Sequence, residues 1–266
     1  MEHFLVYLAI GACAGVLSGL LGVGGGVVIV PALAIIFEQL DVPAAIVLHM
    51  AIGTSLATIV VTSLSSIYAH HRRGAIQWRI AWQLVPTLAI GSLGGAVLVG
   101  YIHSDSLRVL LGIFIFAVAV QIGFGYKPAP HRPLPGRAGM ALAGGGIGLL
   151  SAIFGIGGGI MTVPLLVWRN VPIRLATATS VVCGLIIALA GAAGFMIGGV
   201  QASALNAHLS QWSTGFVYWP AFAGIVVASV PTAPLGAWLA HVLATRWLEI
   251  VFAVILGMTA LKLLTL

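Results

Sequence analysis

Apolar stretches of 20 residues or more follow one another along almost the whole chain and leave few folds open to it. Charged residues make up only 6% of the 266 residues, whereas the residues AVILMFWYC make up 61%, a composition that excludes a soluble globular domain. In lipid, each unpaired backbone group costs several kcal/mol, so spanning segments are helices or closed barrels. Continuous apolar runs, rather than alternating ones, favour helices. The sequence therefore predicts an all-α polytopic membrane protein.

The chain is divided by a polar break at residues 126–137, YKPAPHRPLPGR, which is rich in proline and basic residues. The two parts resemble each other, because GVGGGVVIVP at 22–31 matches GIGGGIMTVP at 155–164 at an offset of 133 residues. The pair Thr54-Ser55 matches Thr179-Ser180 at an offset of 125 residues. We therefore predict a first transmembrane repeat at residues 1–125, a cytoplasmic linker loop at 126–138 and a second repeat at 139–266, a duplication typical of transporters.

Each repeat begins with an apolar segment that is broken by glycines. The 35 residues at 3–37 are too many for one upright helix and too few for two full spans, since one span takes about 20 residues. If the broken segment is a hairpin, each half crosses the membrane three times and the second half is inverted. If it crosses, each half has four crossings and the repeats run parallel.

The distribution of basic residues favours the hairpin. In that arrangement, nine of the eleven Lys and Arg residues lie on one face, which would be the cytoplasmic one: Arg72, Arg73, Arg79, Lys127, Arg132, Arg137, Arg169, Arg174 and Arg246. We thus predict two inverted repeats in the inner membrane, each consisting of a Gly-broken helical hairpin and three transmembrane helices.

The glycine motifs then approach the membrane centre from opposite faces. Glycine adopts positive φ and allows close approach to a ligand. Short helices that begin near Gly26 and Gly159 would direct free N–H groups at this point, which suits an anion. The predicted substrate-binding backbone consists of Gly24, Gly25, Gly26, Gly157, Gly158 and Gly159. Pro31 and Pro164 fit either as first residues of these helices or as kinks. Glycine pairs such as Gly91 and Gly95 are interpreted as helix-packing residues.

Matched polar residues accompany the motifs. The hydroxyls of Thr54, Ser55, Thr179 and Ser180 either donate to the substrate or bond to their own helix carbonyls. Ser18 and Ser151 are interpreted as packing residues. His49 and Arg174 correspond at the offset of 125 residues and are candidates for attracting anions at the two mouths. His49 is also the one plausible intramembrane proton carrier, and facilitated movement down the anion gradient stays open.

The motifs GLLGVGGGVVIVP and SAIFGIGGGIMTVP, each followed by GTS or ATS, resemble the TauE/SafE family of sulfite and organosulfonate transporters over nearly the whole chain. The resemblance implies a small sulfur-containing anion, such as sulfite or sulfoacetate, as cargo. A non-sulfur anion or a metal cation is the alternative cargo.

Other classes of function are disfavoured by what the membrane segments contain. No acidic residue falls convincingly inside a span, which argues against a cation pump. An intramembrane enzyme would need a nucleophile with a base or a metal site, and neither pattern is found. We expect no catalytic residue, no resident metal or cofactor and no nucleic-acid partner. The expected partners are the small anion and the lipid bilayer, and the sequence is compatible with a homo-oligomer.

Overall fold

The computed structural model describes residues 2–21, 25–124, 136–203, 212–242 and 245–265. The first half forms α1 (Glu2–Leu21), α2 (Gly26–Gln39), α3 (Ala44–Arg72), α4 (Trp78–Val99) and α5 (Ser104–Phe124). The second half forms α6 (Arg137–Phe154), α7 (Gly159–Trp168), α8 (Ile173–Ser203), α9 (Trp219–Val242) and α10 (Thr245–Thr265). Between α8 and α9 lies a small antiparallel hairpin of β1 (Ser213–Thr214) and β2 (Val217–Tyr218). Most of the predicted linker, residues 126–135, lies outside the described residues.

Four helices within the described residues are long and apolar enough to cross a membrane: α3, α4, α5 and residues Ile173–Val200 of α8. The 21 residues of α5 span about 31 Å at 1.5 Å per residue, which matches the hydrocarbon core of a bilayer. Large apolar side chains face outward on these helices, among them Ile90, Ile113 and Ile197. The predicted all-α polytopic membrane fold is confirmed, with the β1–β2 hairpin as an element that the sequence patterns did not indicate.

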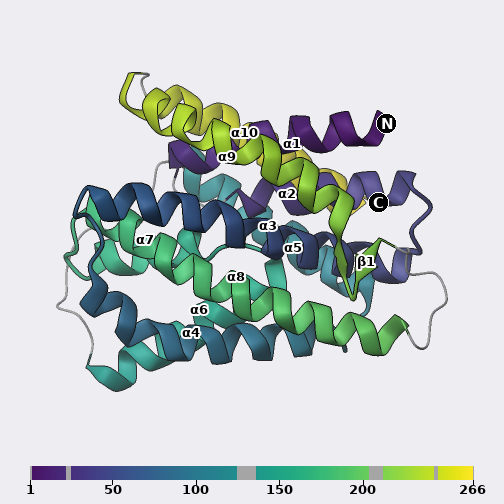
Figure 1. Cartoon of the computed structure of the whole chain (residues 1–266), viewed down its shortest axis with the longest axis horizontal. Helices are drawn as coiled ribbons and strands as arrows, with labels where there is room; N and C mark the ends of the chain where they lie inside the picture. Colours follow the sequence, from purple (N-terminus) through teal and green to yellow (C-terminus); the bar gives the residue numbers. More distant parts are fainter. Residues whose placement is uncertain (1, 22–24, 125–135, 204–211, 243–244, 266) are drawn as a thin grey trace.

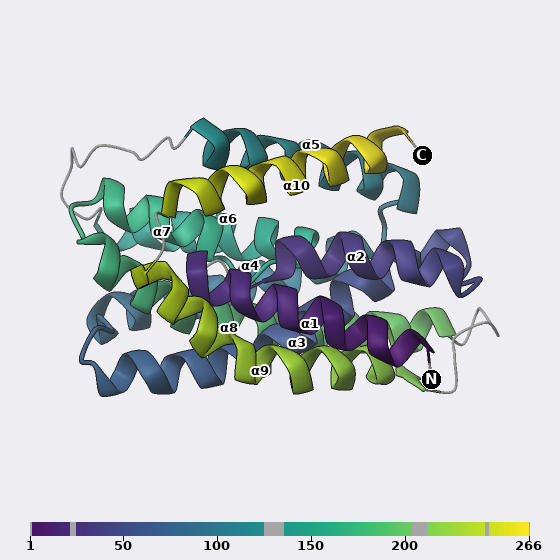
Figure 2. The ribbon, with the colours of Figure 1, turned by 90° about the horizontal axis from the view of Figure 1, so that it is seen from above.

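The first glycine-broken segment folds back on itself. Figure 2 shows that α1 and α2 run in opposite directions, so that α2 ends near the end of the molecule where α1 begins. The ribbon places the connection from α3 to α4 at the opposite end of the molecule, and both chain termini at the first end (Figure 1). This course of the chain matches the hairpin alternative. The inverted relation between the halves, and which end faces the cytoplasm, stay predictions.

The most extensive helix contacts join the two halves of the chain. Helix α1 packs on α9, and its counterpart α6 packs on α4. Likewise α3 contacts α8, and α5 contacts α10 along the side of the molecule seen in Figure 2. The apolar core is therefore shared: a single buried cluster includes Leu33 and Leu56 of the first half and Phe195 and Leu256 of the second.

Glycines allow the closest of these helix contacts. A Cβ atom on Gly91 of α4 would collide with the carbonyl oxygen of Gly145 in α6, and a Cβ on Gly95 would lie 2.5 Å from the carbonyl oxygen of Leu149. Backbones in contact in this way are typical of small residues at helix interfaces in membranes. The interpretation of Gly91 and Gly95 as packing residues is confirmed.

The Gly91→Ala variant is expected to lower the free energy of unfolding by about 1–3 kcal/mol, because the added methyl group forces α4 and α6 apart. Thermal melting of the purified protein in detergent measures this loss. Gly94 of the same helix is the matched control, since a Cβ there meets nothing within 4 Å. Gly94→Ala should leave stability unchanged or raise it by up to about 1 kcal/mol, because alanine is the better helix former. Equal melting of the two variants would contradict the packing role.

Candidate functional site

Helices α2 and α7 begin in the interior at glycines with left-handed backbone. Gly25 precedes α2 with φ of 71°, and Gly158 precedes α7 with φ of 72°, and neither helix has a side-chain cap. The starts at Gly26 and Gly159 agree with the sequence prediction. Because the first N–H groups of a helix have no partner within it, each start presents donors and the positive end of the helix dipole. Gly24 lies outside the described residues.

Pro31 and Pro164 lie inside α2 and α7 rather than at their first positions. The interpretation as first helical residues is therefore wrong. A proline within a helix cannot donate to the carbonyl four residues earlier, so the carbonyls of Val27 and Ile160 lose their helical donor. Each short helix thus has an uncapped start and, about one turn later, a missing helical hydrogen bond at its proline.

The two glycine motifs meet in the interior. A Cβ on Gly26 would lie 2.5 Å from the carbonyl oxygen of Gly155, which has φ of 69° and ends α6. The hydroxyl of Ser55 donates to this same carbonyl over 2.9 Å. In the second half, the carbonyl oxygen of Gly157 lies against Gly184 of α8. Gly26 and Gly157 therefore take part in close backbone packing at the point where the motifs meet.

Two connecting segments are held by threonines of the opposite half. The backbone N–H of Tyr218, just before α9, donates to the Thr54 hydroxyl over 3.0 Å. The backbone N–H of Gln77, just before α4, donates to the Thr179 hydroxyl, also over 3.0 Å. Because Thr54 and Thr179 correspond in the two repeats, the same bond is made twice in reciprocal directions. We call these two bonds the threonine latches.

The four predicted hydroxyl residues all have protein partners in this conformation. Thr179 also donates to the carbonyl of Leu175, and Ser180 donates to that of Thr177, so both bond within their own helix. Ser55 instead reaches the glycine motif of the other half. A substrate that contacts any of these hydroxyls would have to share or replace its present hydrogen bond. Substrate binding by these four residues stays a prediction.

Removing one threonine latch tests its contribution to the free energy of unfolding. Thr54→Val is expected to cost about 1–3 kcal/mol of unfolding free energy, because the partly buried N–H of Tyr218 loses its acceptor. The control is Thr58→Val, at a fully buried threonine one turn further along α3 whose hydroxyl bonds only within its helix, to the carbonyl of Ser55. Melting curves of both variants give the comparison. A Thr58→Val variant as destabilised as Thr54→Val would remove the latch interpretation.

His49 and Arg174 occupy unlike surroundings. His49 is buried, with its Nε2 3.1 Å from the carbonyl oxygen of Val99 and its ring 5.2 Å from that of Phe216 in the β1–β2 turn. Its Nδ1 has no hydrogen-bond partner among the described residues. Arg174 is exposed at the start of α8. The structure therefore does not bring the two together, and their role in gating or proton coupling stays a prediction.

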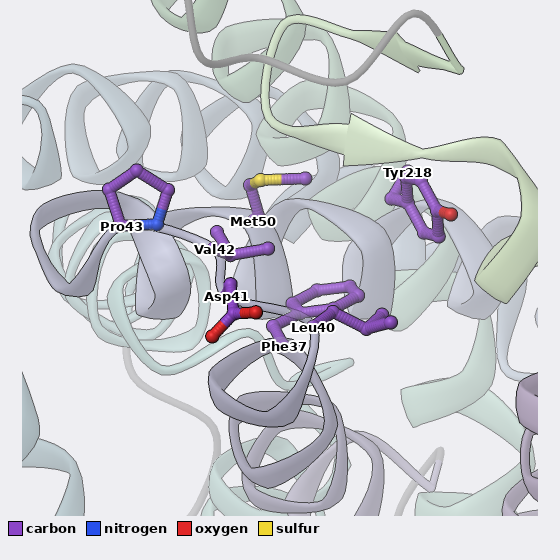
Figure 3. Close-up of a pocket in the computed structure, with 7 residues that line it drawn as sticks. All are labelled: Phe37, Leu40, Asp41, Val42, Pro43, Met50 and Tyr218. Atoms are coloured by element: carbon purple, nitrogen blue, oxygen red, sulfur yellow. The ribbon is translucent and has the colours of Figure 1, made fainter.

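A cavity of about 240 Å³ opens next to one latch (Figure 3). It lies where α2 ends and α3 begins, and its lining residues are Phe37, Leu40, Asp41, Val42, Pro43, Met50 and Tyr218. Tyr218 is the residue whose N–H binds Thr54, and Met50 lies one turn before Thr54 on α3. Among the described residues, no three His, Cys, Asp or Glu side chains gather to form a metal site.

Four residues of the site were missed by the sequence analysis or assigned another role. Gln77 and Tyr218 act through backbone N–H groups, which leave no signal in side-chain patterns. Thr162 of α7 is fully buried, but the 133-residue offset pairs it with Ile29, so a search for matched polar residues passed over it. Ser151 was interpreted as a packing residue, although its buried hydroxyl has no partner among the described residues.

Comparison with known proteins identifies the family of this chain. The family model described as "Sulfite exporter TauE/SafE" matches residues 7–263. The chain belongs to the TauE/SafE family. A probable membrane transporter protein of Haemophilus influenzae is 32% identical to this TauE/SafE member over 263 residues, which cover 97% of both chains. A probable membrane transporter protein of Methanocaldococcus jannaschii is 29% identical over 265 residues, covering 97% of this chain and 94% of that protein.

The probable membrane transporter protein YunE of Bacillus subtilis is 28% identical over 217 residues, or 74% of this chain and 79% of the relative. The family match and the apolar helices together make this TauE/SafE member a membrane transporter. The glycine motifs that begin α2 and α7 lie within the matched range of the family model.

Proposed function

We propose that this transporter moves a small sulfur-containing anion, such as sulfite, sulfoacetate or another organosulfonate, across the cytoplasmic membrane as a multi-pass secondary carrier or facilitator. The observation that carries the proposal is the pair of uncapped helix starts at Gly25 and Gly158 in the interior. Helix starts are ready-made sites for anions, since N–H groups and the helix dipole both favour negative charge. The name of the matched family supports sulfur anions among the candidate cargoes.

The electrostatic surroundings support an anion over a cation. The acidic side chains whose exposure the structure describes lie at helix ends and are exposed: Glu38, Asp41 and Asp105. Glu38 is paired with Arg108 at 2.7 Å. A metal cation transported through the interior would need carboxylate, thiolate or imidazole ligands. Movement of the anion changes none of its bonds, so the protein acts on it as a carrier and not as an enzyme.

Proteoliposomes that contain the purified protein test the proposal. Radiolabelled sulfite should accumulate down an imposed sulfite gradient faster than in empty liposomes, and sulfoacetate should compete with it. Taurine should compete less well, because its ammonium group would face the positive ends of α2 and α7. Chloride and nickel serve as competing cargoes. Nickel transport without transport of any sulfur anion would contradict the proposal and favour the metal-cation alternative.

A further inference from the structure

Two buried hydroxyls converge on the start of α7. The oxygens of Ser151 and Thr162 would each lie 3.6 Å from a Cβ atom placed on Gly158. Ser151 is 1% exposed and Thr162 is 0% exposed, and neither oxygen has a hydrogen-bond partner among the described residues. Ser151 comes from α6 and Thr162 from α7, so the two helices of one broken hairpin direct a hydroxyl at the same point.

Unpaired hydroxyls at full burial are unusual, because a buried polar group normally finds a partner. Comparable hydroxyls of this chain do so: Thr58 donates to the carbonyl of Ser55, and Ser92 donates to that of Ile187. Thr162 lies on a helix and could bond backwards as Thr58 does, yet its oxygen is left without a partner. A ligand with acceptor atoms is the natural partner for both.

The surroundings define the chemistry of that ligand. The α7 start adds backbone N–H donors that no side chain caps. Cδ1 of Ile187 lies against the same point, so this methyl group has to turn aside when a ligand binds. The donors are therefore neutral and come from at least three groups, which suits an anion with three acceptor oxygens, such as a sulfonate or sulfite. The lone pairs of a carboxylate lie in one plane and a halide has no preferred hydrogen-bond directions, so a pyramidal or tetrahedral oxyanion matches donors that converge from two helices better than either.

The first half does not offer the same set. Ile29 occupies the position that corresponds to Thr162, and the three atoms nearest to a Cβ on Gly25 would all belong to Ala14, so none of them is a hydroxyl oxygen. We propose that Ser151 and Thr162, with the start of α7, form an oxyanion-binding half-site that only the second repeat possesses. This inference rests on the proposed function and adds that the two repeats bind the anion unequally.

Calorimetric titration of sulfite into the purified full-length protein tests this half-site. Ser151→Ala and Thr162→Val should each weaken sulfite affinity by about 10- to 100-fold, since each removes a hydrogen bond to a charged ligand. Thr162→Ser keeps the hydroxyl and should bind within about threefold of the wild type. Melting curves provide a second readout: without ligand, Ser151→Ala and Thr162→Val should melt at or above the wild-type temperature, because they remove unpaired groups.

The control variant is Thr58→Val, which removes a paired, fully buried hydroxyl. It should melt lower than the wild type but bind sulfite normally. Unchanged sulfite affinity in both Ser151→Ala and Thr162→Val would overturn the half-site, as would chloride or acetate binding as tightly as sulfite. If the wild type binds sulfite and only glycine variants lose it, the proposed function stands and the half-site falls. If the wild type binds no sulfur anion, the proposed function itself falls.

Discussion

Gly158→Val is expected to abolish sulfite binding. The backbone at this position has φ of 72°, a conformation that costs a β-branched residue about 1–3 kcal/mol or more. The new side chain would also collide with Cδ1 of Ile187 and occupy the space in front of the α7 start. Gly25→Val should likewise impair binding, because φ is 71° and its Cβ would lie 3.2 Å from the carbonyl oxygen of Ala14.

Backbone strain alone must be separated from loss of the site. Gly74 provides the control, since it also has positive φ, at 62°, but a Cβ there meets nothing within 4 Å. Gly74→Ala should lower the melting temperature slightly and leave sulfite affinity unchanged. Calorimetry and melting curves on the three variants give both quantities. Normal binding by Gly25→Val and Gly158→Val would make these glycines structural residues and would overturn the anion-carrier proposal.

The second large effect is an all-or-none difference in the reaction of introduced cysteines with a thiol reagent that cannot cross the membrane. In a background without Cys13 and Cys183, a cysteine at Gln39 should react with an impermeant thiol reagent added outside intact cells. A cysteine at Ala138, at the start of α6, should react only after the membrane is permeabilised. The reason is that the hairpin arrangement places the connections rich in Lys and Arg on the cytoplasmic side, and the start of α6 directly follows one of them.

A cysteine at Glu2 provides the decisive comparison, because Glu2 and Gln39 are the outer ends of one broken hairpin. Both should label from outside. Labelling of Glu2 and Gln39 from opposite sides would mean that the first segment crosses the membrane, and the parallel arrangement would replace the inverted one.

Local patterns in the sequence predict most of the helices of this chain. The glycine-broken apolar segment at 3–37 forms α1 and α2, and the polar break at 126–137 separates α5 from α6. These features are local, because helix length follows from the run of apolar residues and a helix break follows from clustered glycines. The same reasoning placed Gly26 and Gly159 at the helix starts.

The partners of the site residues could not be predicted in the same way. Thr54 was assigned a choice between substrate and its own helix, yet it accepts a bond from Tyr218, which is 164 residues away. Bonds over such separations depend on tertiary packing, which a hydropathy pattern does not encode. Comparison of the repeats also favoured residues that are alike in both halves and therefore missed Thr162, whose counterpart is Ile29.

The threonine latches have a consequence for how the protein is made. Thr54 leaves the ribosome long before Tyr218, and at about 5–20 residues per second the interval is roughly 8 to 30 s. The hydrogen bond from the hydroxyl of Ser55 likewise forms only after Gly155 has been synthesised, 100 residues later. During synthesis the first half therefore sits in the membrane with its latch partners absent, and a chain truncated before residue 218 never acquires them. We expect nascent and truncated chains to depend on insertion chaperones that shield these helices until the second half arrives.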